Sequence, residues 1–113
     1  MWREIKNFNN YQVSKSGLVR NKKTKSIIKP FVNNNGYLRV NLYKGGIGYK
    51  KLVHVIVAEA FIDNPLNFNE IDHINNNRKD NKVSNLKYIT HSDNIKKVWR
   101  EGAFKKRLKK EDD

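Results

Sequence analysis

Hydrophobic and polar residues alternate in the first half of the chain, which is the pattern of half-buried β-strands. The clearest example is residues 36–43, in which Leu38, Val40 and Leu42 fall on one face. The opposite face of this expected strand is aromatic and polar and comprises Tyr37, Arg39, Asn41 and Tyr43. The Asn-Asn-Asn-Gly run at 33–36 predicts a turn before it, since Asn and Gly tolerate positive φ angles.

Further short apolar runs separated by turn residues predict an antiparallel meander over residues 1–52. One strand is expected at 11–14 and its partner at 18–20, joined by a turn at Lys15-Ser16-Gly17. Two more short strands are expected at 27–28 and 49–52, each after a polar turn. We therefore expect a small N-terminal antiparallel β-sheet.

The apolar spacing changes to a helical period at residue 52. The apolar side chains follow the i, i+1, i+4, i+5 spacing of one helix face and comprise Leu52, Val53, Ile56, Val57, Ala60 and Phe61. Asp63-Asn64-Pro65 ends this helix, because the residue before a proline disfavours the α region. The pattern predicts a helix over 53–62 as the core element on which the sheet packs.

The remaining pattern predicts a β-hairpin followed by a second helix. Strands are expected at 70–74 and 87–90, with an Asn-rich polar loop at 75–86 between them. Thr90 suits the N-cap of the last helix, whose apolar stripe is Ile95, Val98 and Trp99. The expected fold class is α+β, with an N-terminal sheet at 1–52, a linking helix and strand–strand–helix unit at 53–100, and a basic tail at 101–113.

The charge of the chain indicates a polyanionic partner. Lys and Arg number 24 against 11 acidic residues, so the formal net charge is +13. Such an excess favours phosphate backbones through counterion release, and a charge that only maintains solubility is the alternative. The chain has no cysteine, which excludes disulfides, thiolate zinc sites and a cysteine nucleophile. Without an apolar span of about 18 residues or a signal-peptide core, we expect a soluble cytoplasmic protein.

Four polar residues of the C-terminal half have a spacing that suits phosphodiester chemistry, namely Asp72, His73, Asn85 and Asn94. The expected hairpin and helix bring Asp72 and Asn94 towards each other, and two oxygen ligands suit Mg²⁺ or Mn²⁺. Neighbouring strand residues point to opposite sides of a strand. His73 can therefore activate a water on one side of a phosphate while a metal held by Asp72 lies on the other.

These residues resemble the motif of the HNH endonucleases, specifically the homing-type branch of phages and introns, which has the ββα-metal fold. The resemblance rests on Ile71-Asp72-His73-Ile74-Asn75-Asn76-Asn77, Asn81, Ser84-Asn85-Leu86-Lys87-Tyr88-Ile89-Thr90 and Ser92-Asp93-Asn94. Residues 53–61 are similar to the lead-in of the same branch. The N-terminal residues Trp2, Ile5, Tyr11-Gln12-Val13-Ser14, Gly17 and Val19-Arg20 resemble a NUMOD4 module.

The resemblance implies a metal-dependent DNA endonuclease that leaves 5′-phosphate and 3′-hydroxyl ends. It assigns His73 as the general base and Asn85 as the residue that ties the loop and orients the base strand. Asp72 and Asn94 would hold one Mg²⁺ or Mn²⁺ ion. One such site cuts one strand, so we expect nicking of double-stranded DNA by a monomer, with a dimer as the alternative. Some relatives carry a helix-turn-helix module after the nuclease, and we do not expect one within these 113 residues.

Basic residues beside the expected site and on the N-terminal sheet are candidates for DNA contact. These are Arg20, Arg39, Arg78, Lys79, Lys82, Lys96, Lys97 and Arg100. For each of them a solvated surface charge is the alternative. His54 is expected to hydrogen-bond within the core, and His91 to face solvent near a helix start.

Two functions of other classes remain open at this point. A DNA-binding protein without activity would use the same sheet and basic tail. An RNA-binding accessory protein would share the charge, although no aromatic strand of the RNP type is visible. Metal-dependent cleavage of DNA distinguishes the endonuclease from both.

Overall fold

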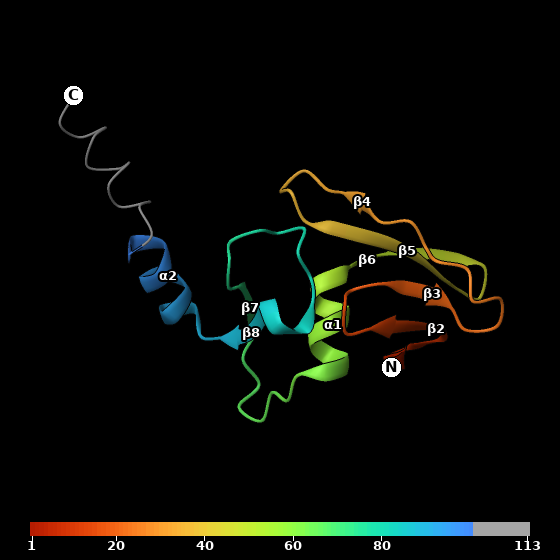
Figure 1. Ribbon diagram of the computed structural model, residues 1–113, viewed down its shortest axis with the longest axis horizontal. Helices are drawn as coiled ribbons and strands as arrows, with labels where there is room; N and C mark the ends of the chain where they lie inside the picture. Colours follow the sequence, from red (N-terminus) through yellow and green to blue (C-terminus); the bar gives the residue numbers. More distant parts are fainter. Residues whose placement is uncertain (101–113) are drawn as a thin grey trace.

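Three antiparallel sheets and two α-helices make up residues 1–100, which are the residues that the computed structural model describes (Figure 1). The side chains of residues 98–100 and all of residues 101–113, where the basic tail is expected, lie outside the described part. The first sheet has the order β1-β2-β3 and comprises Trp2–Ile5, Phe8–Ser14 and Val19–Asn21. The second has the order β4-β5-β6 and comprises Phe31–Val32, Leu38–Lys44 and Ile47–Leu52.

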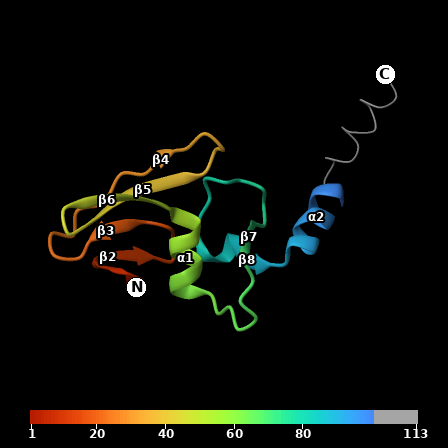
Figure 2. The ribbon, with the colours of Figure 1, turned by 180° about the vertical axis from the view of Figure 1, so that it is seen from behind.

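The C-terminal part is a two-stranded hairpin followed by a helix. The strands are β7 (Glu70–His73) and β8 (Leu86–Ile89), and a 3₁₀ turn, η1 (Val83–Asn85), leads into the second strand. The last helix, α2, covers His91–Arg100 and extends away from the N-terminal sheets in both side views (Figures 1 and 2). Its N-cap is Thr90, whose Oγ1 accepts a hydrogen bond of 3.1 Å from the Asp93 backbone N–H. The expected cap is confirmed.

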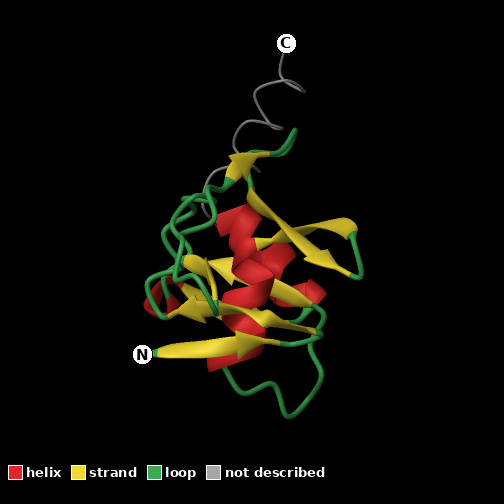
Figure 3. Cartoon of the chain, turned by 90° about the vertical axis from the view of Figure 1, so that its right-hand side faces the viewer, coloured by secondary structure: helices red, strands yellow, loops and turns green. Residues whose placement is uncertain are grey.

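The helix α1 (Val53–Phe61) is the centre of the core. It contacts β1 and β2 of the first sheet, β5 and β6 of the second, and both strands of the hairpin. Seen from the N-terminal side, strands of the first two sheets lie in front of the helices (Figure 3). The fully buried side chains come from both sides of residue 52 and include Val13, Val40, Leu42 and Val57. Burying each such side chain contributes about 1.5–3 kcal/mol, so one shared core holds the N-terminal sheets to α1.

The expected α+β class is confirmed, with small antiparallel sheets and two helices. Three details differ from the sequence-based expectation. The N-terminal strands form two sheets rather than one. The strand expected at 27–28 is wrong, because only a single bridge between Arg20 and Ile27 forms there. The strands β1 and β4 have no counterpart in the expectation, because β1 alternates weakly and β4 has only two residues. Tertiary pairing forms both, as in the register of Trp2 opposite Ser14.

Neither helix within residues 1–100 is long and apolar enough to cross a membrane.

Candidate active site

The hairpin places Asp72 and His73 at the end of β7, directly before the polar loop. Asp72 pairs with Lys87 and His73 pairs with Leu86 across the hairpin. Both residues are buried, with 8% and 6% of their surface exposed. A buried aspartate needs a charged or hydrogen-bonding partner, because isolating a carboxylate from water is costly.

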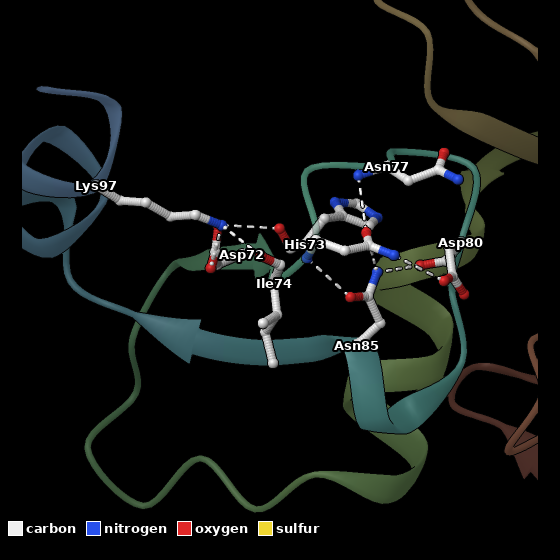
Figure 4. A network of polar contacts seen from close by, with 8 residues as sticks. Asp72, His73, Ile74, Asn77, Asp80, Asn85 and Lys97 are labelled. Atoms are coloured by element: carbon white, nitrogen blue, oxygen red, sulfur yellow. Dashed lines mark hydrogen bonds and ion pairs between the residues drawn. The ribbon is translucent and has the colours of Figure 1, made fainter. Parts of the chain in front are cut away.

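The partner of Asp72 is Lys97 of α2, whose side chain reaches across to the strand end (Figure 4). Lys97 Nζ lies 2.8 Å from both carboxylate oxygens of Asp72. The carbonyl oxygens of His73 and Ile74 lie 2.8 Å and 3.3 Å from the same nitrogen. Four oxygens therefore face one ammonium group, so this position favours a positive charge.

Asn94 approaches the same place from the first turn of α2. It lines a pocket of about 200 Å³ together with Asp72, His73 and Lys97. Carboxylate and amide oxygens are the donors that Mg²⁺ and Mn²⁺ take, and the surrounded Lys97 ammonium marks the pocket as one that accepts a cation. The residues present therefore fit a divalent ion. Their role as its ligands stays a prediction.

Two aromatic rings pack around the imidazole of His73. The His54 ring lies edge-on, with its centroid 4.9 Å from that of His73, and the Tyr37 centroid lies at 5.8 Å. Tyr37 and His54 also contact each other at 5.0 Å. The imidazole of His73 is hydrogen-bonded through Nε2, which lies 2.7 Å from Oδ1 of the buried Asn81. The ring is thus restricted on its faces and at one edge.

His54 is neutral at neutral pH in this environment. Burial, with a smaller contribution from the nearby His73, lowers the pKa of His54 from 6.5 to about 4. Its Nδ1 is buried and has no hydrogen-bond partner among the described residues. The expected core hydrogen bond is therefore missing at this nitrogen, and the ring instead packs beside the proposed base.

Asn85 ties the loop after β7 to the start of β8. Its Oδ1 accepts a hydrogen bond of 3.0 Å from the Asn75 backbone N–H. Its Nδ2 donates to the Asn75 side chain at 2.9 Å and to the Asp80 carbonyl at 2.8 Å (Figure 4). All hydrogen-bonding positions of this buried amide except one acceptor site are thus used within the loop. The arrangement supports a bracing role and leaves Asn85 no direct contact with a reacting group.

The basic residues expected at DNA are divided between the loop, α2 and the N-terminal sheets. Lys79, Lys82 and Lys96 are exposed, and Lys82 forms an ion pair of 3.2 Å with Asp80. Arg78 stacks 4.8 Å from the Tyr37 ring and donates to the Asn35 carbonyl at 2.6 Å.

Of the remaining candidates, Arg20 and Lys97 are bound by other residues of the protein. Arg20 donates to Gln12 at 2.9 Å and stacks on Trp2 at 3.9 Å. Arg39 is half-buried on β5, and Lys97 is bound to Asp72. Arg100 is in α2, and its side chain lies outside the described part. The exposed His91 contacts Glu70 at 3.0 Å and does not line the pocket.

The sequence pattern does not predict three neighbours of His73. The alternation puts Tyr37 on the solvent face of a strand, but β5 begins at Leu38, so the alternation does not extend to Tyr37. The helical period puts His54 in the core with no link to the site. Asn81 enters only through the family resemblance. The hydrogen bond between Asn81 Oδ1 and His73 could be anticipated only by knowing how the Asn-rich loop folds back.

Comparisons with known proteins show which proteins this chain resembles. The NUMOD4 motif matches residues 1–43. The chain is 33% identical over 91 residues to an uncharacterized HNH endonuclease of Acanthamoeba polyphaga mimivirus, covering 80% of this chain and 28% of that protein. It is 32% identical over 104 residues to the DNA endonuclease I-HmuI of Bacillus phage SP01, covering 91% and 60%. The chain therefore spans between about a quarter and three fifths of these relatives' length.

A solved structure also shows similarity to an HNH endonuclease. The HNH homing endonuclease I-HmuI, in a structure described as DNA binding and cleavage, superposes with a TM-score of 0.82 at 29% identity. The match covers 97% of this chain and 66% of that one. The fold is that of the HNH endonuclease class. More particularly, the chain is a homologue of the homing-type HNH endonucleases with a NUMOD4 motif at its N-terminus.

Proposed function

We propose that the chain is a DNA endonuclease that hydrolyses one phosphodiester bond of double-stranded DNA per site with the help of Mg²⁺ or Mn²⁺. The observation that carries this proposal is the convergence of Asp72, His73 and Asn94 on one pocket lined with hydrogen-bonding groups. The names of the relatives support DNA as the substrate. We also infer that the protein acts as a monomer inside a bacterial host cell, by analogy with the phage relative.

The residues of the pocket have different roles in the proposed hydrolysis. His73 accepts the proton of the attacking water, since imidazole is the usual base for such a step. Asp72 and Asn94 hold the divalent ion, which when bound stabilises negative charge on the phosphate and on the leaving oxygen. The products are a 5′-phosphate and a 3′-hydroxyl. A single pocket of this kind acts on one strand, so the expected product is a nick.

Basic side chains around the pocket and on the N-terminal sheets are the DNA contacts of this proposal. The exposed lysines of the loop and α2 contribute charge without base preference. Arg20 and Arg78 are partly fixed by contacts with the protein, and together with Arg39 they offer planar guanidinium donors for phosphate. Arg100, on α2, is a further proposed DNA contact.

The test is incubation of supercoiled plasmid with the purified chain in Mg²⁺, in Mn²⁺ and in EDTA. We expect metal-dependent conversion to nicked circles, and a loss of about 10²–10⁴-fold in rate for His73→Ala. His91→Ala is the matched control, because this histidine is exposed and outside the pocket. Equal nicking by the wild type and His73→Ala would contradict the assignment.

The alternative function is DNA binding without cleavage. It is favoured by one observation, namely that Asp72 is already neutralised by Lys97. Salt-sensitive DNA binding with no cleavage in either metal would establish this alternative. Preferential binding to single-stranded RNA would contradict both functions.

A further inference from the structure

The side chain of Asn81 connects the N-terminal motif to the imidazole of His73. Asn81 Oδ1 lies 2.7 Å from His73 Nε2, and both residues are buried, with 4% and 6% of their surface exposed. A neutral imidazole has one N–H donor and one acceptor nitrogen, and the partner of one nitrogen decides the state of the other. The orientation of the Asn81 amide therefore determines which nitrogen of His73 can accept a proton.

We propose that Asn81 is a positioning residue for the general base. Its Oδ1 accepts a hydrogen bond from Nε2–H of His73 and so keeps the lone pair on Nδ1 available. This inference rests on the proposed function for its catalytic meaning, but the hydrogen bond itself does not.

The two ends of the Asn81 amide are used unequally in the structure. Nδ2 of Asn81 is buried and has no hydrogen-bond partner among the described residues. Only the oxygen is used, so the side chain serves as an acceptor. With the amide reversed, Nδ2 would donate to Nε2 and the hydrogen of the neutral ring would lie on Nδ1. His73 would then have no free lone pair for a water molecule.

The N-terminal motif holds Asn81 in place. Gly17 lies in a turn between β2 and β3 with a φ of +92°, and a Cβ built there would lie 3.1 Å from the Asn81 carbonyl oxygen. Two residues further along the loop, the Val83 backbone N–H donates to the Lys15 carbonyl at 2.8 Å. The turn at 15–17 therefore packs against the loop that carries Asn81, and the motif at 1–43 is part of the support of the site.

The hydrolysis step conserves protons and electrons without any further reactant. The attacking water gives one proton to Nδ1 of His73, and its oxygen forms a bond to phosphorus. The bond from phosphorus to the 3′-oxygen breaks, and that oxygen leaves with the electron pair and takes a proton from solvent water. The imidazolium keeps its Nε2–H bonded to Asn81 and returns the Nδ1 proton to solvent.

The first test is spectroscopic and needs neither metal nor DNA. Long-range ¹H–¹⁵N spectra of the ¹⁵N-labelled full chain distinguish the two nitrogens, and with only three histidines the signals can be assigned by single substitutions. We expect His73 with a protonated Nε2 and an unprotonated Nδ1 at a pH where the ring is neutral. A protonated Nδ1 would overturn the proposal, even if the chain cleaves DNA.

The second test compares Asn81→Leu, which removes the acceptor at similar size, with Asn81→Asp, which keeps an acceptor and replaces the unused Nδ2 by a second oxygen and a negative charge. In Asn81→Leu we expect fast solvent exchange of the Nε2–H proton and a single-turnover cleavage rate lower by about 10–10²-fold, with unchanged DNA affinity. In Asn81→Asp the proton signal and most of the rate should be retained. A lowered rate in Asn81→Asp equal to that in Asn81→Leu would contradict the acceptor role.

Asn77→Leu is the matched control. This residue lies in the same loop, is exposed, and uses its amide oxygen on the Lys79 backbone N–H. It should retain both the rate and the His73 signals. If the wild type cleaves nothing, the proposed function fails, while the spectra still decide whether Asn81 holds the Nε2–H of His73.

Discussion

Lys97 and Asp72 form the most buried ion pair among the described residues, with the ammonium 2.8 Å from each carboxylate oxygen. The two side chains expose only 14% and 9% of their surface. The sequence places Lys97 among the DNA contacts, and in this structure it instead lies where a metal held by Asp72 would be expected. Asp72 can accept a divalent ion only if the ammonium moves away from at least one of its oxygens.

Lys97→Met is therefore expected to bind Mn²⁺ more tightly than the wild type, by about tenfold, because the ion no longer displaces an ammonium. Isothermal titration of the full chain with Mn²⁺ measures this. The same substitution leaves a buried carboxylate without a partner and should lower the metal-free stability by about 3 kcal/mol. Lys96→Met, at an exposed position of the same helix, should change neither quantity. Unchanged Mn²⁺ affinity in Lys97→Met would show that Asp72 is not a ligand of the metal ion.

Asn85→Ala should destabilise the fold by about 2–4 kcal/mol. The substitution removes the three hydrogen bonds that join the loop to Asn75 and Asp80 and leaves buried groups without partners. Urea unfolding followed by far-ultraviolet circular dichroism measures the change. Asn77→Ala, which removes one exposed hydrogen bond, should cost less than about 1 kcal/mol. Equal effects of the two substitutions would show that Asn85 does not brace the loop.

His54 makes the fold sensitive to acid. Burial lowers the pKa of His54 to about 4 in the folded chain from its ordinary value of 6.5, so between these values the unfolded chain binds a proton that the folded chain does not. Its contribution is fully present above about pH 6.5 and is lost as the pH falls towards 4. The expected loss is at most about 3 kcal/mol.

The measurement is the free energy of unfolding of the wild type and of His54→Phe from pH 7.5 to about pH 4. His54→Phe keeps a ring against Tyr37 and His73 but cannot titrate, so its stability should fall less steeply with acid. His91→Phe is the control at an exposed histidine and should follow the wild type. If the free energy of unfolding fell equally with acid in the wild type and in His54→Phe, His54 would not be the origin of the acid sensitivity.

Gly17→Ala should impair the site through Asn81. The added Cβ would lie 3.1 Å from the Asn81 carbonyl oxygen at a φ of +92°, so the turn or the loop must shift. We expect a loss of about 1–3 kcal/mol in stability and a lower cleavage rate. Gly46→Ala carries similar backbone strain, with a φ of +80°, but a Cβ there meets nothing within 4 Å. It should lose stability alone, and a lower cleavage rate in Gly46→Ala would mean that strain rather than the contact with Asn81 is responsible.

Local patterns were sufficient for the elements that carry the expected site. The helical spacing after residue 52, the hairpin with its polar loop, and the Thr90 cap can all be predicted and are all present. These features depend on residues a few positions apart, whose periodicity and capping preferences can be seen in the sequence. The proximity of Asp72, His73 and Asn94 can be predicted in the same way, because one hairpin and one helix turn bring these residues together.

The sequence by itself determined the α+β class, the basic character and the candidate residues of the hairpin and last helix. Only the tertiary structure decided what surrounds His73. Tyr37, His54 and Asn81 reach it from three separate segments, and Lys97 reaches Asp72 over 25 residues. Such neighbours are selected by packing between distant parts of the chain, and no local period or propensity encodes that choice.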